Sequence, residues 1–381
     1  MPRDSSRRLL GGATPAQFLA RHWQKRPLLV RGAVPGFAGA IDAHELMRLA
    51  CDEHVESRIV VRGRRRNWQV LHGPFRPSAF RSLGERGWTL LVQDLNHHVQ
   101  AAHDLLRAFR FLPNARLDDV MASYAAPGGG VGPHVDSYDV FLLQGPGIRR
   151  WRIGRQRDLG LVQGAPLKLL RRFAPTQEWR LGPGDMLYLP PSYAHDGTAM
   201  TACMTYSIGF RAPAWQELTS QFLAWLQDRV KREGLYTDPD LTPTHTPGRL
   251  GAGLIDRAAE QLARIRWSRA DVSRFLGCYL TEPKPSVFFT PPAQALGRSV
   301  FERLAWRHGV ALDRKSRMLY NGREIFLNGE LEPLDGTAAK HLRALADAGS
   351  LRPGPDLRVS LSEPLYAWYR AGFIHLVTGV P

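Results

Sequence analysis

The sequence predicts a mainly β domain with added helices, followed by a helical segment and a small α/β domain. Between residues 115 and 210, β-branched and aromatic runs alternate with Gly/Pro turns and show no helical pattern, which is typical of a β-sandwich or barrel. Apolar residues take up helical spacing from residue 214, and the Pro/Thr-rich stretch 238–249 has the composition of a linker. At 381 residues, the chain is long enough for two or three domains.

The first hundred residues indicate a mixture of short helices and strands. A helix is expected in "TPAQFLARHWQ", where Thr14 and Pro15 form a start signal, and another in "DAHELMRLACDE", which begins with an Asp. The short apolar runs "RPLLVRGA" and "RIVVRG" are bounded by Gly or Pro and predict strands.

The β-rich region follows, with strands expected in "VFLLQGPGIRRWRIG", "EWRLGPGDMLYLPPS" and "CMTYSIGFRA". The next helix, "AWQELTSQFLAWLQDRV", carries apolar residues near helical spacing at Trp215, Leu218, Phe222, Trp225, Leu226 and Val230. Further helices are predicted in "LIDRAAEQLARIRW" and "RADVSRFLGCYL". The last hundred residues combine strand-like "MLYNGREIFLNGE" with helices in "TAAKHLRALADAG" and "SEPLYAWYRAGFIHLV".

Composition narrows the class of protein. The chain is 44% hydrophobic and 23% charged, which is ordinary for a soluble globular protein. It has no apolar run of the roughly 18 residues that span a bilayer, and its N-terminus lacks the apolar core of a signal peptide, so we expect a cytoplasmic protein. Cys51, Cys203 and Cys278 are widely separated and predict neither a disulfide framework nor a zinc ribbon.

The net charge of +16 admits two interpretations. It predicts attraction to a polyanion such as nucleic acid or a ribonucleoprotein particle, and Arg residues cluster in "RGRRRNW" and "RRWRIGRQR". A coding bias towards Arg would produce the same excess. Arg clusters alone do not separate a nucleic-acid binder from a protein that works beside one.

A His-x-Asp pair predicts half of a metal site. In "GGGVGPHVDSYDVFLLQG", His134, Asp136 and Tyr138 would share one face of a strand, because side chains alternate along a strand. His195 follows a second apolar strand and a double proline, and completes a set of two imidazoles and one carboxylate. Such a set leaves open positions on the metal, as in non-haem iron(II) oxygenases. Asp139 has the opposite strand parity and Asp185 is expected to be a turn residue, so we exclude both from this set.

The two segments that carry these residues resemble a known family. "GPHVDSYDVFLLQGPGIRRW" together with "GDMLYLPPSYAHDG" is similar to the JmjC subfamily of cupin-fold, 2-oxoglutarate-dependent oxygenases. The resemblance is closest to the bacterial ribosomal oxygenases, the YcfD-like arginine hydroxylases, whose opening segment is also similar to "FLARHWQKRPLLVRGA".

The resemblance implies a fold and a reaction. The fold would be a double-stranded β-helix (cupin-type) barrel in residues 1–213, with its core in 95–213, then a helical dimerisation segment, 214–280, and a winged-helix-like domain, 281–381. The cofactors would be Fe(II), 2-oxoglutarate and dioxygen, with metal ligands His134, Asp136 and His195. The reaction would couple oxidative decarboxylation of 2-oxoglutarate to hydroxylation of an unactivated C–H bond.

The cosubstrate also needs a basic residue for its far carboxylate. Arg149 and Trp151 would share one face of the strand after "QGPG", and Arg150 the other face. An arginine facing a barrel interior is costly unless it is paired with an anion. The resemblance implies that Arg149 grips the carboxylate and that Ser123 assists it. The alternative, with Arg149 and Arg150 both in solvent, stays open.

The resemblance further implies the substrate, an arginine of the sixteenth large-subunit ribosomal protein that is hydroxylated at its β-carbon. Asp119, Met121 and Tyr138 would receive it: an acid pairs the charge, an aromatic ring offers a cation–π contact and a thioether packs the aliphatic stem. Each also has an ordinary interpretation: Asp119 as a solvated or capping residue, Met121 as core and Tyr138 as barrel filling.

Two rival functions and an oligomeric state complete the expectations. JmjC relatives also hydroxylate His or Asn, or demethylate lysine, and the metal ligands do not separate these reactions. A non-catalytic nucleic-acid-binding regulator with a basic winged helix would fit the charge, although it would not need the three metal ligands. The aromatic surface of the helix with Trp215, Phe222 and Trp225 must be buried, and the resemblance favours a homodimer. No direct nucleic-acid binding is required for the oxygenase, and no membrane contact is expected.

Overall fold

The computed structural model describes residues 3–63, 67–322, 324–332, 336–354 and 362–377, and it places the β-rich region in two antiparallel sheets. The larger sheet has eight strands in the order β1-β10-β7-β12-β5-β4-β2-β3. Its strands, in chain order, are β1 (Leu28–Val30), β2 (Ser57–Arg62), β3 (Trp68–His72), β4 (Trp88–Val92), β5 (Leu117–Ala125), β7 (Val140–Gln144), β10 (Met186–Leu189) and β12 (Cys203–Phe210).

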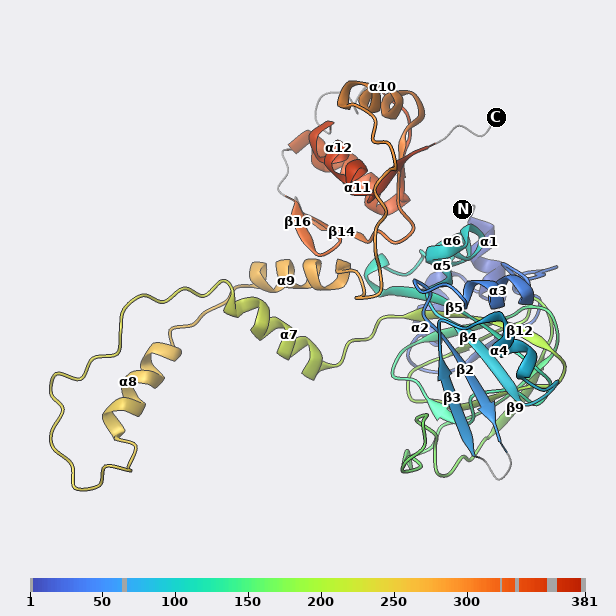
Figure 1. Ribbon diagram of the computed structural model, residues 1–381, viewed down its shortest axis with the longest axis horizontal. Coiled ribbons are helices and arrows are strands. Elements are labelled where there is room, and N and C mark those ends of the chain that lie inside the picture. The colour runs from blue at the N-terminus through green and yellow to red at the C-terminus, as the bar shows by residue number, and fades with distance from the viewer. Residues whose placement is uncertain (1–2, 64–66, 323, 333–335, 355–361, 378–381) are drawn as a thin grey trace. The chain divides into compact units, whose positions relative to one another are not determined.

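The smaller sheet has the order β6-β11-β8-β9. Its strands are β6 (His134–Val135), β8 (Arg149–Gly154), β9 (Gln177–Leu181) and β11 (Ala194–Ala199). Every pairing in both sheets is antiparallel, as in the predicted barrel. Figure 1 shows β2, β3 and β4 side by side at the edge of the larger sheet.

Short helices accompany the first strands: α1 (Arg3–Leu9), α2 (Pro15–Arg21), α3 (Ala43–Leu49), α4 (Pro77–Ser82), α5 (Leu95–His98) and α6 (Gln100–Arg107). The helix predicted at Thr14 is confirmed as α2, because the Thr14 side chain accepts from the Gln17 N–H and Gln17 returns the bond in a capping box. Asp42 caps α3 in the predicted way. We did not predict α1, α4, α5 or α6.

Alternation along the strands divides the apolar residues between two clusters. On β7, Phe141 and Leu143 join the large core on the helix-covered face of the larger sheet. Val140 and Leu142, which point the other way, pack with Trp151 of the smaller sheet in a second cluster. The candidate site lies on this second face of β7, between the two sheets.

The remaining helices are α7 (Trp215–Gln227), α8 (Ala252–Leu262), α9 (Arg269–Thr281), α10 (Arg298–His308), α11 (Gly336–Ala348) and α12 (Ser362–Arg370). Two three-stranded sheets accompany them, one of β13 (Val310–Leu312), β17 (Ser350–Leu351) and β18 (Ile374–Leu376), and one of β14 (Met318–Asn321), β15 (Glu324–Leu327) and β16 (Glu330–Glu332). By contacts the chain forms two units: 1–212 with 283–316 and 344–381, and 213–282 with 317–343. The division into 1–213, 214–280 and 281–381 stays a prediction.

One predicted helix is wrong in its second half. "SEPLYAWYRAGFIHLV" forms α12 only as far as Arg370, and Gly372 then adopts a φ of 77°, which ends the helix. The apolar residues that follow form β18, which pairs with β13 from a distant part of the sequence. Among the described residues, no helix is both long and apolar enough to cross a membrane.

Candidate metal centre and its pocket

The two candidate metal-binding histidines lie opposite each other on neighbouring strands. β6 and β11 pair so that His134 faces His195, and the ring centroids are 4.1 Å apart. The Nδ1 atom of His134 lies 2.9 Å from the Gly132 carbonyl oxygen, and that of His195 lies 2.9 Å from the Tyr193 carbonyl oxygen. Each ring therefore donates Nδ1–H to the backbone and keeps its Nε2 lone pair for a metal.

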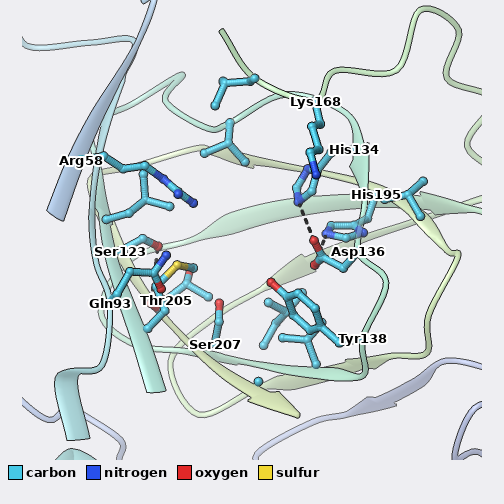
Figure 2. A pocket seen from close by; sticks show the side chains of 18 of the residues that line it. Arg58, Gln93, Ser123, His134, Asp136, Tyr138, Lys168, His195, Thr205 and Ser207 are labelled. Carbon is cyan, nitrogen blue, oxygen red and sulfur yellow. Dashed lines mark hydrogen bonds and ion pairs between the residues drawn. The ribbon is translucent and has the colours of Figure 1, made fainter. Parts of the chain in front are cut away.

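Asp136 completes the group. Its carboxylate oxygens lie 3.8 Å from His134 Nε2 and 3.5 Å from His195 Nε2. Two ligand atoms that each bind one ion at about 2.1 Å cannot be more than about 4.2 Å apart, so these distances fit a shared divalent ion. Figure 2 shows the three side chains converging on one side of the cavity.

Burial supports the same chemistry. The side chain of His195 is 3% exposed, and desolvation, followed by the nearby His134, lowers the pKa of His195 to about 4. The imidazole is therefore neutral at physiological pH, which is the form that binds metals. Two imidazoles and one carboxylate suit Fe(II) and leave coordination positions open for other ligands.

The strand predicted to carry all three residues is shorter than expected. β6 ends at Val135, and residues 136–139 form a bend before β7 begins. Asp136 and Tyr138 therefore reach the pocket from this bend rather than from a regular strand. Tyr138 still lines the cavity, with 40% of its surface exposed.

Arg149 is a buried cation whose guanidinium is fixed by three hydrogen bonds. It is 3% exposed, and its Nη1 donates to Ser123 Oγ and to Thr205 Oγ1, both at 3.2 Å, while Nη2 donates to the Gly197 carbonyl at 3.2 Å. Its Nε is buried without a hydrogen-bond partner in the described parts of the chain. Desolvation lowers the pKa of this guanidinium, but an arginine stays charged in proteins. Among the described residues, this guanidinium donates only to neutral groups, so it can still pair with a bound carboxylate.

The predicted faces of β8 are confirmed. Arg149 and Trp151 point inward, with the guanidinium 5.1 Å from the centre of the Trp151 ring, whereas Arg152 pairs with Asp196 at 2.6 Å on the other side and Arg150 is half-buried. Gly197 on β11 leaves room for both inward side chains, because a Cβ there would lie 2.6 Å from Trp151 and 2.8 Å from Arg149 Nε.

The cavity has a volume of about 380 Å³. The predicted residues Asp119, Met121 and Ser123 all line it, in agreement with their shared parity on β5. Asp119 is 9% exposed, and burial, followed by the charges of Asp94 and Asp118, raises its pKa to about 7. A buried carboxyl group of this kind gains from pairing with a cation.

Sequence reasoning missed several pocket residues: Arg58, Gln93, Lys168, Thr205 and Ser207. Figure 2 shows Arg58, Gln93 and Ser123 across the cavity from His134 and Asp136. Register explains two of them, because Thr205 pairs with Ser123, Ser123 with Leu91, and Leu91 with Arg58 across four neighbouring strands. An arginine at the start of the strand-forming run "RIVV" was the available signal for Arg58.

The two excluded carboxylates have structural partners. Asp139 is fully buried and accepts from Tyr188 OH at 2.6 Å and from Gln24 Nε2 at 3.0 Å. Asp185 accepts from the Gly32 and Gly182 N–H groups, as expected of a turn residue. The central arginines of "RGRRRNW", residues 64–66, lie outside the described residues, so the predicted cluster there has no structural description.

Two family models match the chain. The JmjC domain matches residues 104–218, and the ROXA-like winged helix matches residues 264–354. The first match includes all three candidate metal ligands, together with Arg149 and Ser123.

Several known proteins are similar over most of the chain. The ribosomal protein uL16 3-hydroxylase of Escherichia coli (strain K12) is 37% identical over 335 residues, which are 86% of this chain and 87% of that protein. A structure of YcfD, a ribosomal oxygenase from Escherichia coli, has 34% identity and a TM-score of 0.80, and covers 96% of this chain and 98% of the other. A structure of YcfD from Escherichia coli in complex with cobalt and 2-oxoglutarate has 33% identity and a TM-score of 0.79, and the match covers 95% of this chain and 98% of the other.

Proposed function

Because this chain belongs to the JmjC-domain ribosomal oxygenases, the family of the Escherichia coli uL16 3-hydroxylase, we propose that it hydroxylates an arginine of ribosomal protein uL16 at the β-carbon. It is a 2-oxoglutarate-dependent oxygenase whose cofactors are Fe(II), 2-oxoglutarate and dioxygen. When bound, these cofactors would supply the oxidising power: 2-oxoglutarate would lose carbon dioxide and take up one atom of dioxygen to become succinate, and the other atom would be added to the substrate.

The protein's own part is to hold the reactants. His134, Asp136 and His195 are our proposed metal ligands, and backbone carbonyls fix both imidazoles in the tautomer that presents Nε2. Arg149 is our proposed partner for the distal carboxylate of 2-oxoglutarate, with Ser123 and Thr205 orienting its guanidinium. The observation that carries the proposal is that this unpaired buried cation and the His-Asp-His group line the same cavity.

For the substrate, we propose that Asp119 pairs with the guanidinium, that Tyr138 offers its ring and that Met121 packs against the aliphatic stem. These three side chains line one cavity, and the burial of Asp119 favours a cationic partner over solvent. We also place the reaction in the cytoplasm, where a ribosomal protein would meet the enzyme.

The test is direct. Purified protein is incubated with Fe(II), 2-oxoglutarate and intact uL16, and the product is mapped by fragmentation mass spectrometry. We expect one added oxygen atom on one arginine, with succinate formed in step. Hydroxylation of His or Asn, or demethylation of lysine, would agree with 2-oxoglutarate-dependent oxygenase activity but would contradict arginine as the target residue. Nucleic-acid binding with a steep salt dependence and no succinate would instead favour the regulator.

The metal ligands have their own prediction. Replacing His134, Asp136 or His195 with Ala removes one of three ligands, so bound Fe(II) and 2-oxoglutarate turnover should both be lost. Metal content by plasma mass spectrometry and succinate release measure the two effects, with thermal melting as a check on folding. Chelation of wild-type protein should abolish turnover and added Fe(II) should restore it. Full activity and metal content in His195→Ala would contradict the assignment.

We also propose that the chain forms a homodimer. Phe222 and Trp225 of α7 pack on Phe275 of α9, but Trp215 on the same helix is 85% exposed. None of the residues of α8, all of which the structure describes, is buried, and Leu262 at its end is 66% exposed. Such apolar surface is typical of a protein interface.

Light scattering tests this proposal. We expect a dimer at micromolar concentration and a shift towards monomer in Leu262→Glu, because a buried charge would oppose association. The exposed Leu159→Glu, on a loop of the first unit, serves as the matched control and should stay dimeric. A wild-type monomer would reject the proposal.

A further inference from the structure

Three carboxyl groups and one ammonium group meet behind the end of the pocket that Asp119 lines. Lys284 Nζ lies 2.9 Å and 3.2 Å from the two carboxylate oxygens of Asp94, and 3.6 Å from Asp118 Oδ1. The side chain of Asp94 is 8% exposed and that of Lys284 is 30% exposed. The Asp94 backbone N–H in turn donates to Asp119 Oδ2 at 3.2 Å. Lys284 is thus ion-paired with Asp94, and the backbone of Asp94 is hydrogen-bonded to Asp119.

The local fold explains this arrangement. Asp118 and Asp119 are neighbours on β5 and point to opposite sides of the sheet, so only Asp119 lines the pocket. Asp94 follows β4 with a φ of 49°, a left-handed conformation that Asp tolerates better than most residues. The Asn96 side chain accepts from the Val120 N–H at 2.8 Å and so fixes this connection beside β5. Lys284 comes from the segment 283–316, which belongs to the same unit.

Electrostatics give Lys284 a specific effect on Asp119. Burial, then Asp94 and Asp118, raise the pKa of Asp119 to about 7, whereas Lys284 and the Asp94 N–H lower it. Burial lowers the pKa of Lys284, but the charges of Asp119, Asp118 and Asp94 outweigh it, so that the lysine stays charged. Further described groups also face this cluster: Arg211, which lies 3.4 Å from Asp118, His98, which interacts with Asp94, and Tyr138 across the pocket.

We propose that Lys284 is a positioning residue for substrate recognition, which through Asp94 holds the Asp119 carboxylate in the pocket wall as the anion that pairs with the substrate cation. The inference rests on the proposed function of Asp119 as the receptor of that cation. Without Lys284, three carboxyl groups would lie together without their ammonium partner, and Asp119, whose pKa burial already raises, would take up a proton.

The experiment compares Lys284→Met with Lys284→Arg and with the matched control Lys231→Met, which removes an exposed lysine from a loop of the second unit. KM and kcat for uL16 are measured between pH 6 and 9. Loss of a nearby opposite charge should raise the titration midpoint of the Asp119 carboxyl group in Lys284→Met by about one pH unit. The ionised fraction of Asp119 at pH 7 then falls, and the KM for uL16 should rise about fivefold. At pH 9 the difference should nearly vanish. kcat and the KM for 2-oxoglutarate should not change, and Lys284→Arg and Lys231→Met should resemble wild type.

A second readout needs no substrate. The titration of Asp119 is followed by NMR in protein labelled at the aspartate carboxyl carbon, and the resonance is assigned by its loss in Asp119→Asn. We expect a higher midpoint in Lys284→Met than in wild type. An unchanged midpoint, or an unchanged KM for uL16 in an active variant, overturns the inference. A lower kcat and a raised 2-oxoglutarate KM at every pH would also overturn it, because that pattern indicates general damage. Failure of wild-type protein to hydroxylate uL16 would refute the proposed function instead, and the midpoint then still decides whether Lys284 controls Asp119.

Discussion

Replacing Arg149 with Ala should weaken 2-oxoglutarate binding more than any other single change outside the proposed metal ligands. A guanidinium has five N–H groups. Three hydrogen bonds tie Arg149 to Ser123, Thr205 and Gly197, so two N–H groups, including the buried Nε, stay available for a carboxylate. A charge-assisted hydrogen bond contributes about 1.5–3 kcal/mol. At about 1.4 kcal/mol per factor of ten, the KM for 2-oxoglutarate should rise about 10- to 150-fold.

The assay is succinate release at saturating substrate across a range of 2-oxoglutarate concentrations, with calorimetric titration of the cobalt-loaded protein as an equilibrium check. Arg149→Lys keeps the charge but loses the planar fork, so its KM should fall between those of wild type and Arg149→Ala. Arg150→Ala removes the neighbouring half-buried arginine from the opposite face of β8 and should behave as wild type. An unchanged KM in Arg149→Ala, above all with a raised KM in Arg150→Ala, would refute the reasoning.

Three further outcomes follow from the contacts around the pocket. Ser123→Ala removes one of the three hydrogen bonds that orient the charged guanidinium of Arg149, while Thr205 and Gly197 keep the other two, so the 2-oxoglutarate KM should rise in the same assay, but less than in Arg149→Ala. Gly197→Ala would place a Cβ 2.8 Å from Arg149 Nε, so it should raise that KM as well; a wild-type value would show that the strand moves to make room. Asp139→Asn weakens the buried bond to Tyr188 and should lower the free energy of unfolding by about 1–3 kcal/mol in urea titrations, with the 2-oxoglutarate KM unaffected.

Local chemistry explains the parts of the fold that were predicted. The helix at Thr14 and the helix at Asp42 have capping side chains within three residues of the N–H groups that they satisfy, so short stretches of sequence suffice to place them. The face of β5 that carries Asp119 and Ser123 follows from alternation alone. Helix α10 (Arg298–His308) was missed because its apolar stripe is narrow, with Phe301 and Ala305 as its buried residues.

Non-local pairing explains most of what was not predicted. β18 is short and apolar, and it is a strand because β13 lies beside it, which no pattern within "AGFIHLV" reveals. Thr205 reaches Arg149 because β12 pairs with β5 in one register, which places Thr205 opposite Ser123. A shift of one residue would turn Thr205 away from the pocket.

The sequence by itself determined the donor set of the candidate metal centre, because two imidazoles, one carboxylate and their positions beside apolar strands are properties of residue type and spacing. It also determined which face of β8 carries Arg149. Only the tertiary structure decided that Asp136 lies in a bend after the end of β6, that Thr205 orients the buried guanidinium of Arg149, and that Lys284 pairs with Asp94. These contacts join segments far apart in the chain, and their geometry depends on strand register and on burial, which are settled only when the two sheets and the later segment pack together.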